Sequence, residues 1–195
     1  MVGKTETYTL IKYSKNGEQL LQLFYISIHN YYWRDYKDKI PEDAINGTED
    51  LYIAQVYYQG ILVATLYPTE KKATTECRGA RRIITYPIKV LCDRRKDNFE
   101  WVYVNVKSLN AEKLKDMVVG GYEVGNTLYI GRTFHEGEWK IGRVFPPPYN
   151  YYGLTVWHND GRQYITHDFQ ILRYLGKRED QPPAQCICPS LINSF

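Results

Sequence analysis

The sequence lacks an apolar run long enough to cross a membrane as a helix, and it lacks the hydrophobic core of a secretory signal. Its longest apolar stretch, Leu20 to Ile28, is interrupted by Gln22 and Ser27 and does not lie at the amino terminus. A membrane-spanning helix needs roughly 18 apolar residues, and a signal core must stand near the start of the chain. We therefore expect no signal peptide and no transmembrane segment. The expected location is the cytoplasm, with association with vesicles as an alternative.

Cysteine is scarce, and its spacing does not suggest a metal site. Cys77 and Cys92 are separated by many residues, and Cys186 and Cys188 by a single one. Zinc-binding pairs usually enclose two to four residues. We expect four thiols in a reducing compartment, with no metal and no cofactor. The role of Cys186 and Cys188 is left open.

The motifs of common enzymes are also missing. Gly120-Gly121 is followed by Tyr-Glu and not by the Lys-Ser of a phosphate-binding loop. Glu49 and Asp50 are adjacent, so on a strand they would face opposite sides and make a poor acid–base pair. His135 is expected to be an exposed turn residue. The sequence therefore predicts a protein that is not an enzyme.

Charge of one sign is not in large excess. A formal net charge of +3 does not require a polyanionic partner. The basic groups at Arg78 to Arg82 and at Arg94 to Lys96 alternate with acidic residues, as solvated loops do. Nucleic acid is not an expected partner.

What the sequence does contain is an internal repeat. Residues 51–60 and 128–137 share Leu, Tyr, Ile and a closing Gly at a constant offset of 77 positions. Aromatic residues reach 15%, with 19 tyrosines, and such residues favour pleated, half-buried surfaces. A repeat of this length indicates one supersecondary unit built twice and packed against its copy.

Each copy has the same order of predicted elements. The first runs over 33–92 and the second over 101–175, and each opens with a Trp and continues into the Leu-Tyr-Ile strand. Gly60 and Gly137 are expected to supply a positive φ in a hairpin turn. The return strands are predicted at 61–67 and 139–145, the closing extended runs at 83–91 and 164–172, and a short helix at 111–117.

Two segments lie outside the repeats. Residues 1–32 contain two β-rich runs around Asn16-Gly17, a dipeptide suited to a hairpin turn, and predict an added N-terminal hairpin. Residues 176–195, rich in proline, are expected to form a flexible tail. Because Leu51 to Gln55 is apolar on both faces, the fold class we predict is all-β: a β-sandwich-like module of two pseudo-two-fold related repeats with this extra hairpin.

The ordered series of motifs resembles the DM-nine repeat family, found in natterin-like proteins and in bivalve mannose-binding lectins. In the first copy the matching residues are Trp33, Ile40 to Ile45, Gly47, Leu51 to Ala54, Gly60 and Val90-Leu91. In the second they are Trp101, Gly121, Leu128 to Arg132, Gly137, Gly142-Arg143 and Ile171-Leu172. The resemblance implies a compact all-β module that binds ligands without catalysis.

The resemblance also implies a sugar site. In its lectin members an acidic and a basic residue, usually Asp and Lys, hold mannose; here these positions carry Glu123 and Arg143. In the first copy the acidic position falls at Glu49 or Asp50, and the basic position falls on Leu66. The first copy is therefore expected to have lost the site.

The residues themselves leave two interpretations of this site open. A carboxylate, a cation and an aromatic face such as Trp139 or the Tyr149 to Tyr152 cluster are what a sugar site needs. Glu123 and Arg143 would otherwise form an ordinary ion pair at the rim. Arg132 is either a further ligand contact or a structural cation over an aromatic ring.

The function that we predict is a non-enzymatic, mannose-type lectin-like recognition protein with a part in innate immunity or the response to microbes. The alternative is an intracellular protein-interaction or vesicle-associated scaffold that keeps the fold but has lost the sugar site. Expected partners are a glycan and, for either function, another protein or a second copy of the chain.

Overall fold

The computed structural model describes residues 10–15, 18–23, 31–123, 125–148 and 152–176. The chain divides into two units, one formed by Asn30–Gly176 and one by the terminal segments Met1–His29 and Lys177–Phe195. In the terminal unit, β1 (Leu10–Lys15) pairs antiparallel with β2 (Glu18–Leu23). The predicted Asn16-Gly17 turn and the proposed tail lie outside the described residues.

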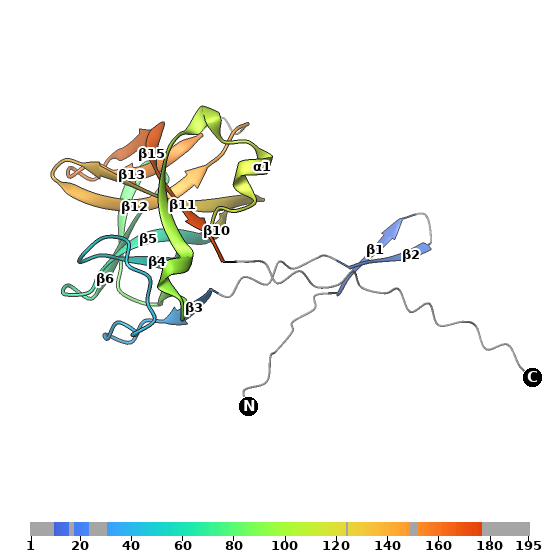
Figure 1. Ribbon diagram of the computed structural model, residues 1–195, viewed down its shortest axis with the longest axis horizontal. Helices are drawn as coiled ribbons and strands as arrows, with labels where there is room; N and C mark the ends of the chain where they lie inside the picture. The colour runs from blue at the N-terminus through green and yellow to red at the C-terminus, as the bar shows by residue number, and fades with distance from the viewer. Residues whose placement is uncertain (1–9, 16–17, 24–30, 124, 149–151, 177–195) are drawn as a thin grey trace, which may run out of the picture. The chain divides into compact units, whose positions relative to one another are not determined.

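The unit Asn30–Gly176 is all-β, as predicted, and its strands belong to one antiparallel sheet of 13 strands. The strands of the first copy are β3 (Tyr32–Asp35), β4 (Tyr52–Tyr57), β5 (Ile61–Tyr67), β6 (Lys72–Cys77), β7 (Ala80–Ile84) and β8 (Ile88–Cys92). Those of the second are β9 (Phe99–Asn105), β10 (Val119–Glu123), β11 (Asn126–His135), β12 (Glu138–Phe145), β13 (Gly153–Trp157), β14 (Gln163–Thr166) and β15 (Asp168–Tyr174). Figure 1 shows the first copy in blue to green and the second mostly in yellow to red.

The strand pairing repeats with the sequence. In the first copy β4, β5, β6 and β7 form a meander, and β8 returns to pair with β4 and β3. In the second, β11 to β14 form the same meander, and β15 returns to pair with β11 and β9. The duplicated supersecondary unit predicted from the sequence is therefore present in the fold.

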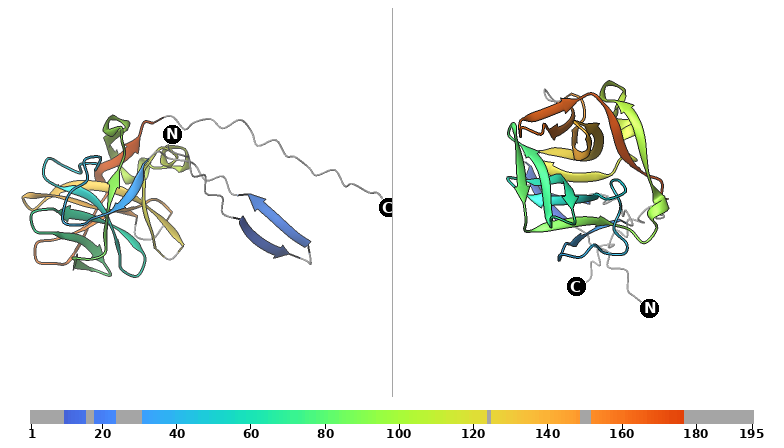
Figure 2. Two further views of the ribbon diagram at one scale, coloured as in Figure 1. Left: turned by 90° about the horizontal axis from the view of Figure 1, so that it is seen from below. Right: turned by 90° about the vertical axis from the view of Figure 1, so that its left-hand side faces the viewer.

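The strands are covered on both sides, as the apolar pattern predicts. Ile53 and Ala54 are adjacent on β4 and face opposite sides of the sheet, yet both are fully buried. One core cluster joins the two copies, with Ile53 and Leu91 from the first and Ile130 and Ile141 from the second. Figure 2 shows the strands of both copies arranged around this shared interior. Part of the apolar surface of each copy is therefore buried against the other copy.

The structure corrects the predicted closing strands. The run 83–91 is divided between β7 and β8, and the run 164–172 between β14 and β15. The division falls at Thr85 to Pro87 in the first copy and at His167 in the second. Pro87 has no N–H to donate to a ladder, so the chain can turn there. Each closing run consequently forms two strands instead of one.

The predicted helix is shorter than expected, and the predicted turns are present. The helix α1 spans Ala111–Leu114, and the Asn110 side chain accepts a hydrogen bond from the Lys113 N–H at its start. Gly60 has a φ of 149° and Gly137 a φ of 86°. Two short 3₁₀ helices, Lys96–Asn98 and Val106–Ser108, flank β9.

The two copies are joined where β10 meets β5. Tyr122 pairs with Ile61, and a Cβ on Gly121 would lie only 2.0 Å from the Ile61 carbonyl oxygen. Glycine is therefore required for the strands to approach at this point. The junction places the end of β10, which carries Glu123, beside the first copy.

Candidate functional site

The structure brings Glu123 and Arg143 together, as the resemblance implies. Glu123 ends β10, and Arg143 lies near the end of β12, twenty residues further along the chain. Arg143 Nη1 donates a hydrogen bond of 2.7 Å to Glu123 Oε2. A second carboxylate, which the sequence analysis missed, completes the group: Arg143 Nη2 lies 2.6 Å from Glu76 Oε2 on β6. Two carboxylates from different copies therefore hold one guanidinium.

Burial differs sharply among these three side chains. Glu76 is fully buried, the Arg143 side chain is 5% exposed, and the Glu123 side chain is 21% exposed. Glu76 Oε1 also accepts the Gly79 N–H at 2.7 Å. A buried carboxylate is tolerated when charged and hydrogen-bonded partners replace water. Glu76 and Arg143 thus form a buried ion pair between the copies, and Glu123 is the member of the group that faces solvent.

The strand register corrects the residue that matches Arg143 in the first copy. Ile53 and Ile130 are equivalent in the sequence repeat; Ile53 pairs with Thr65, and Ile130 pairs with Arg143. The counterpart of Arg143 is therefore Thr65 and not Leu66. The sequence offset fails here because the β4–β5 turn contains Tyr58 to Gly60, whereas the β11–β12 turn contains only Glu136 and Gly137.

Arg132 is half-buried and is held by two rings and two hydrogen bonds. Its guanidinium carbon lies 4.3 Å from the ring centre of Trp101 and 4.8 Å from that of Trp139. Its Nε donates to Gln170 Oε1 at 2.7 Å, and its Nη1 donates to the Gly47 carbonyl. Burial lowers the pKa of Arg132 to about 10, so the group remains a cation at neutral pH. Arg132, Trp101 and Trp139 thus form a cation–aromatic stack within the second copy, and the hydrogen bond to Gly47 ties it to the first.

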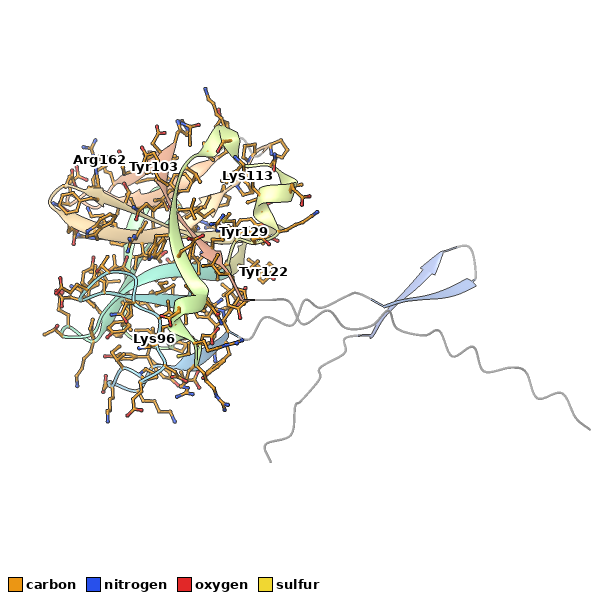
Figure 3. The ribbon with its side chains drawn as sticks, viewed as in Figure 1. Lys96, Tyr103, Lys113, Tyr122, Tyr129 and Arg162 are labelled. Atoms are coloured by element: carbon orange, nitrogen blue, oxygen red, sulfur yellow. The ribbon has the colours of Figure 1, made fainter. Side chains whose placement is uncertain are left out.

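The remaining candidates lie in less constrained places. Glu49 and Asp50 are exposed residues just before β4, and among the described residues no hydrogen bond or ion pair connects either one to Arg143. Tyr122, next to Glu123, is 55% exposed and is labelled in Figure 3. Tyr149 to Tyr151 lie outside the described residues. Because Tyr122 and Glu123 are adjacent on β10, their side chains face opposite sides of the strand. The aromatic ring recorded beside the pair is that of Phe145, whose centre lies 5.3 Å from the Arg143 guanidinium carbon.

A second polar group lies at the β11–β12 turn, where the sequence predicts an exposed histidine. His135 is not exposed: its side chain is only 17% accessible, and its ring stacks on Tyr164 at 3.7 Å with an interplanar angle of 3°. His158, which follows β13, lies beside it, with 3.0 Å between His135 Nε2 and His158 Nδ1. Only the pairing of two distant turns reveals this cluster, because its members are 23 positions apart.

Glu136 completes that second group and is strongly acidic. Its Oε1 lies 2.9 Å from His158 Nδ1, and its Oε2 accepts the Asn159 backbone N–H. These hydrogen bonds, the His158 contact first, lower the pKa of Glu136 to about 2. Burial lowers the pKa of His135. At neutral pH the cluster therefore holds an ionised Glu136 carboxylate and an uncharged His135 imidazole.

The comparisons with known proteins agree with this architecture. The DM9 repeat matches residues 44–152, more than half of the chain. The chain therefore belongs to the DM9 repeat family, the DM-nine repeat of the sequence analysis. No curated protein shows significant similarity to the sequence.

A solved structure with a similar fold is the nematode sperm cell motility protein MFP2B, at 10% identity and a TM-score of 0.51. The alignment covers 80% of this chain and 46% of MFP2B, so this chain spans less than half of that protein. At this identity the likeness concerns the fold alone. Among the described residues, no helix is long and apolar enough to cross a membrane.

Proposed function

We propose that this protein is a non-enzymatic carbohydrate-binding protein of the lectin type, with Glu123 and Arg143 as the polar anchors of the sugar site. The observation that carries the proposal is the 2.7 Å contact between these two side chains, which reach one point from β10 and β12. Membership of the DM9 repeat family supports it, because the resemblance to mannose-binding members maps onto these two positions.

The chemistry of the group suits a sugar. The partly exposed Glu123 carboxylate can accept two hydroxyl protons, and the half-buried Phe145 ring next to Arg143 offers an apolar face for the C–H groups of a pyranose. Arg143, the more deeply buried of the two, binds the Glu123 carboxylate and fixes its orientation. In this arrangement Glu123 makes the first contact with the sugar, and Arg143 acts mainly through Glu123. Mannose is the sugar that we propose, and recognition of microbial glycans is the biological role.

The alternative, a protein-interaction or vesicle-associated scaffold, is favoured by one observation. Both terminal nitrogens of Arg143 already bind carboxylates, and its side chain is almost inaccessible. A guanidinium bound by two carboxylates stabilises the junction between the copies even without a ligand. In that case the fold is kept for a protein partner, and the sugar site is lost.

Titration of the full chain with mannose and manno-oligosaccharides, followed by NMR or calorimetry, separates the two proposals. We expect millimolar binding of the monosaccharide, because a single small site offers few contacts. Glu123→Gln keeps the size of the side chain but removes its charge, and it should abolish the binding. Glu49→Gln, the matched change at the exposed acidic position of the first copy, should leave the binding unchanged.

Two results would contradict the lectin function. One is the absence of any chemical-shift change or heat at high millimolar sugar. The other is equal binding by the parent chain and the Glu123→Gln variant. Either result, obtained on a folded protein, supports the scaffold function.

A further inference from the structure

Three metal-binding side chains meet at the free ends of two neighbouring hairpins in the second copy. His135 ends β11, Glu136 follows it in the β11–β12 turn, and His158 comes from the connection between β13 and β14. One ligand atom from each lies within 4.8 Å of the other two, and His158 Nδ1 lies 3.0 Å from His135 Nε2 and 2.9 Å from Glu136 Oε1. Separations of about 3 to 4 Å are those between ligands that share one transition metal, given metal–ligand distances of about 2.0 to 2.2 Å. We propose that this cluster is a site for a divalent transition metal of the zinc class.

The chemistry of the donors fits such an ion. Two imidazole nitrogens and one carboxylate oxygen are ligands that Zn²⁺ accepts, and three protein ligands leave one position open to water. A neighbouring cation, Lys140, donates to the Trp157 carbonyl oxygen at 2.9 Å and to Asn159 Oδ1 at 3.0 Å. It also forms ion pairs with Glu138 at 3.3 Å and with Glu136 Oε2 at 3.6 Å. Because Lys140 and the Asn159 N–H engage Glu136 Oε2, Glu136 Oε1, 2.9 Å from His158 Nδ1, is the oxygen that would bind the metal.

The ligands are held in place by groups around them. The Tyr164 ring fixes the plane of His135, and the Asn159 backbone N–H fixes the Glu136 carboxylate. Glu136 itself has a φ of +53°, a left-handed conformation that is costly for a residue other than glycine. Supporting contacts of this kind orient the ligands of metal sites.

The fold does not require these residues. By the strand register, His135 matches Tyr58 in the first copy, and His158 matches Cys77. The first copy builds the same two hairpins with these other residues. The cluster is therefore a feature of the second copy alone, and the bound metal would fasten the β11–β12 turn to the β13–β14 connection, near Arg162 in Figure 3. This site is independent of the proposed sugar site.

The test uses the full chain with Cys186→Ser and Cys188→Ser, so that tail thiols cannot bind zinc. After removal of metal by a chelator, Zn²⁺ is titrated in competition with a chromophoric chelator. We expect one equivalent to bind, with at least about a tenfold loss of affinity in His158→Ala and in Glu136→Gln. His167→Ala is the matched control, because His167 stacks on Tyr152 and lies outside the cluster; it should bind as the parent does.

Co²⁺ gives a second measurement. Its ligand-field spectrum should appear on binding without a thiolate charge-transfer band and should vanish in His158→Ala. Circular dichroism of each metal-free variant checks that it is folded. Less than one equivalent bound to the parent chain, unchanged affinity in the two ligand variants, or a thiolate band would each overturn the proposal.

Discussion

The two copies share a strand topology but differ in what they place at equivalent positions. Where the second copy has Arg143, the first has Thr65, whose Oγ1 accepts the Ile141 N–H at 2.8 Å and donates to the Ile141 carbonyl at 2.9 Å. Where the first copy has Glu76, the second has the buried Trp157. The first copy therefore supplies Glu76 and the second supplies Arg143 to the buried ion pair. The pseudo-symmetry of the copies does not repeat this ion pair. After a duplication, one fold can assign structural and binding roles to different copies.

The largest expected effect comes from removing the charge that the second copy contributes. Arg143→Met leaves Glu76 buried without a cation, which should cost about 3–5 kcal/mol of unfolding free energy. Urea denaturation at neutral pH measures it. Thr65→Val changes the equivalent position in the first copy and removes only neutral hydrogen bonds, so about 1–3 kcal/mol is expected. Equal costs for the two variants would show that the copies are not specialised in this way.

An intermediate effect separates the two hairpin turns. Gly137→Ala meets no atom within 4 Å and should cost about 1–2 kcal/mol for its positive φ alone. Gly60→Ala has a positive φ too, and its Cβ would also lie 2.8 Å from the Tyr122 carbonyl oxygen. We expect Gly60→Ala to lose about 1–3 kcal/mol more, because the junction between the copies cannot relax freely. Thermal unfolding of the two variants tests the order, and a more harmful Gly137→Ala would contradict it.

The smallest effect concerns whether the first copy opens alone. Cys77 and Cys92 both belong to the first copy, and both are free and buried. Burial, aided by the nearby Asp43 carboxylate, raises the pKa of Cys92 to about 12. The thiol should therefore stay protonated and unreactive at pH 8 to 9 in the folded protein.

Thiol labelling in the Cys186→Ser, Cys188→Ser background measures this protection. Because a core cluster contains residues of both copies, labelling in rising urea should follow global unfolding, as circular dichroism reports it. Labelling that precedes the loss of circular dichroism would mean that the first copy opens while the second remains folded.

The sequence was most informative where the pattern was local or repeated. The Leu-Tyr-Ile strand, its glycine turn and the return strand are all at the predicted positions. Matching residues by a constant offset gave Leu66 instead of Thr65, since turns of different length shift the register by one residue. The division of the closing runs was missed, although Pro87 marks it in the first copy; His167, where the second run divides, gives no such signal.

Which polar side chains contact one another was decided by the tertiary structure and not by their spacing in the sequence. The pairing of Glu123 with Arg143 followed from the resemblance, but Glu76 reached it only through the packing of β6 against the second copy. His135, Glu136 and His158 likewise meet because two turns end side by side.

The sequence by itself determined that two all-β copies exist and where their hairpins turn, because strand periodicity and glycine turns are properties of short segments. Only the tertiary structure decided which charges are buried together, which histidines lie side by side and which residue of the first copy is equivalent to Arg143. Such groups are joined by contacts between strands far apart in the chain, and the register of those contacts is set by the packing of the whole sheet.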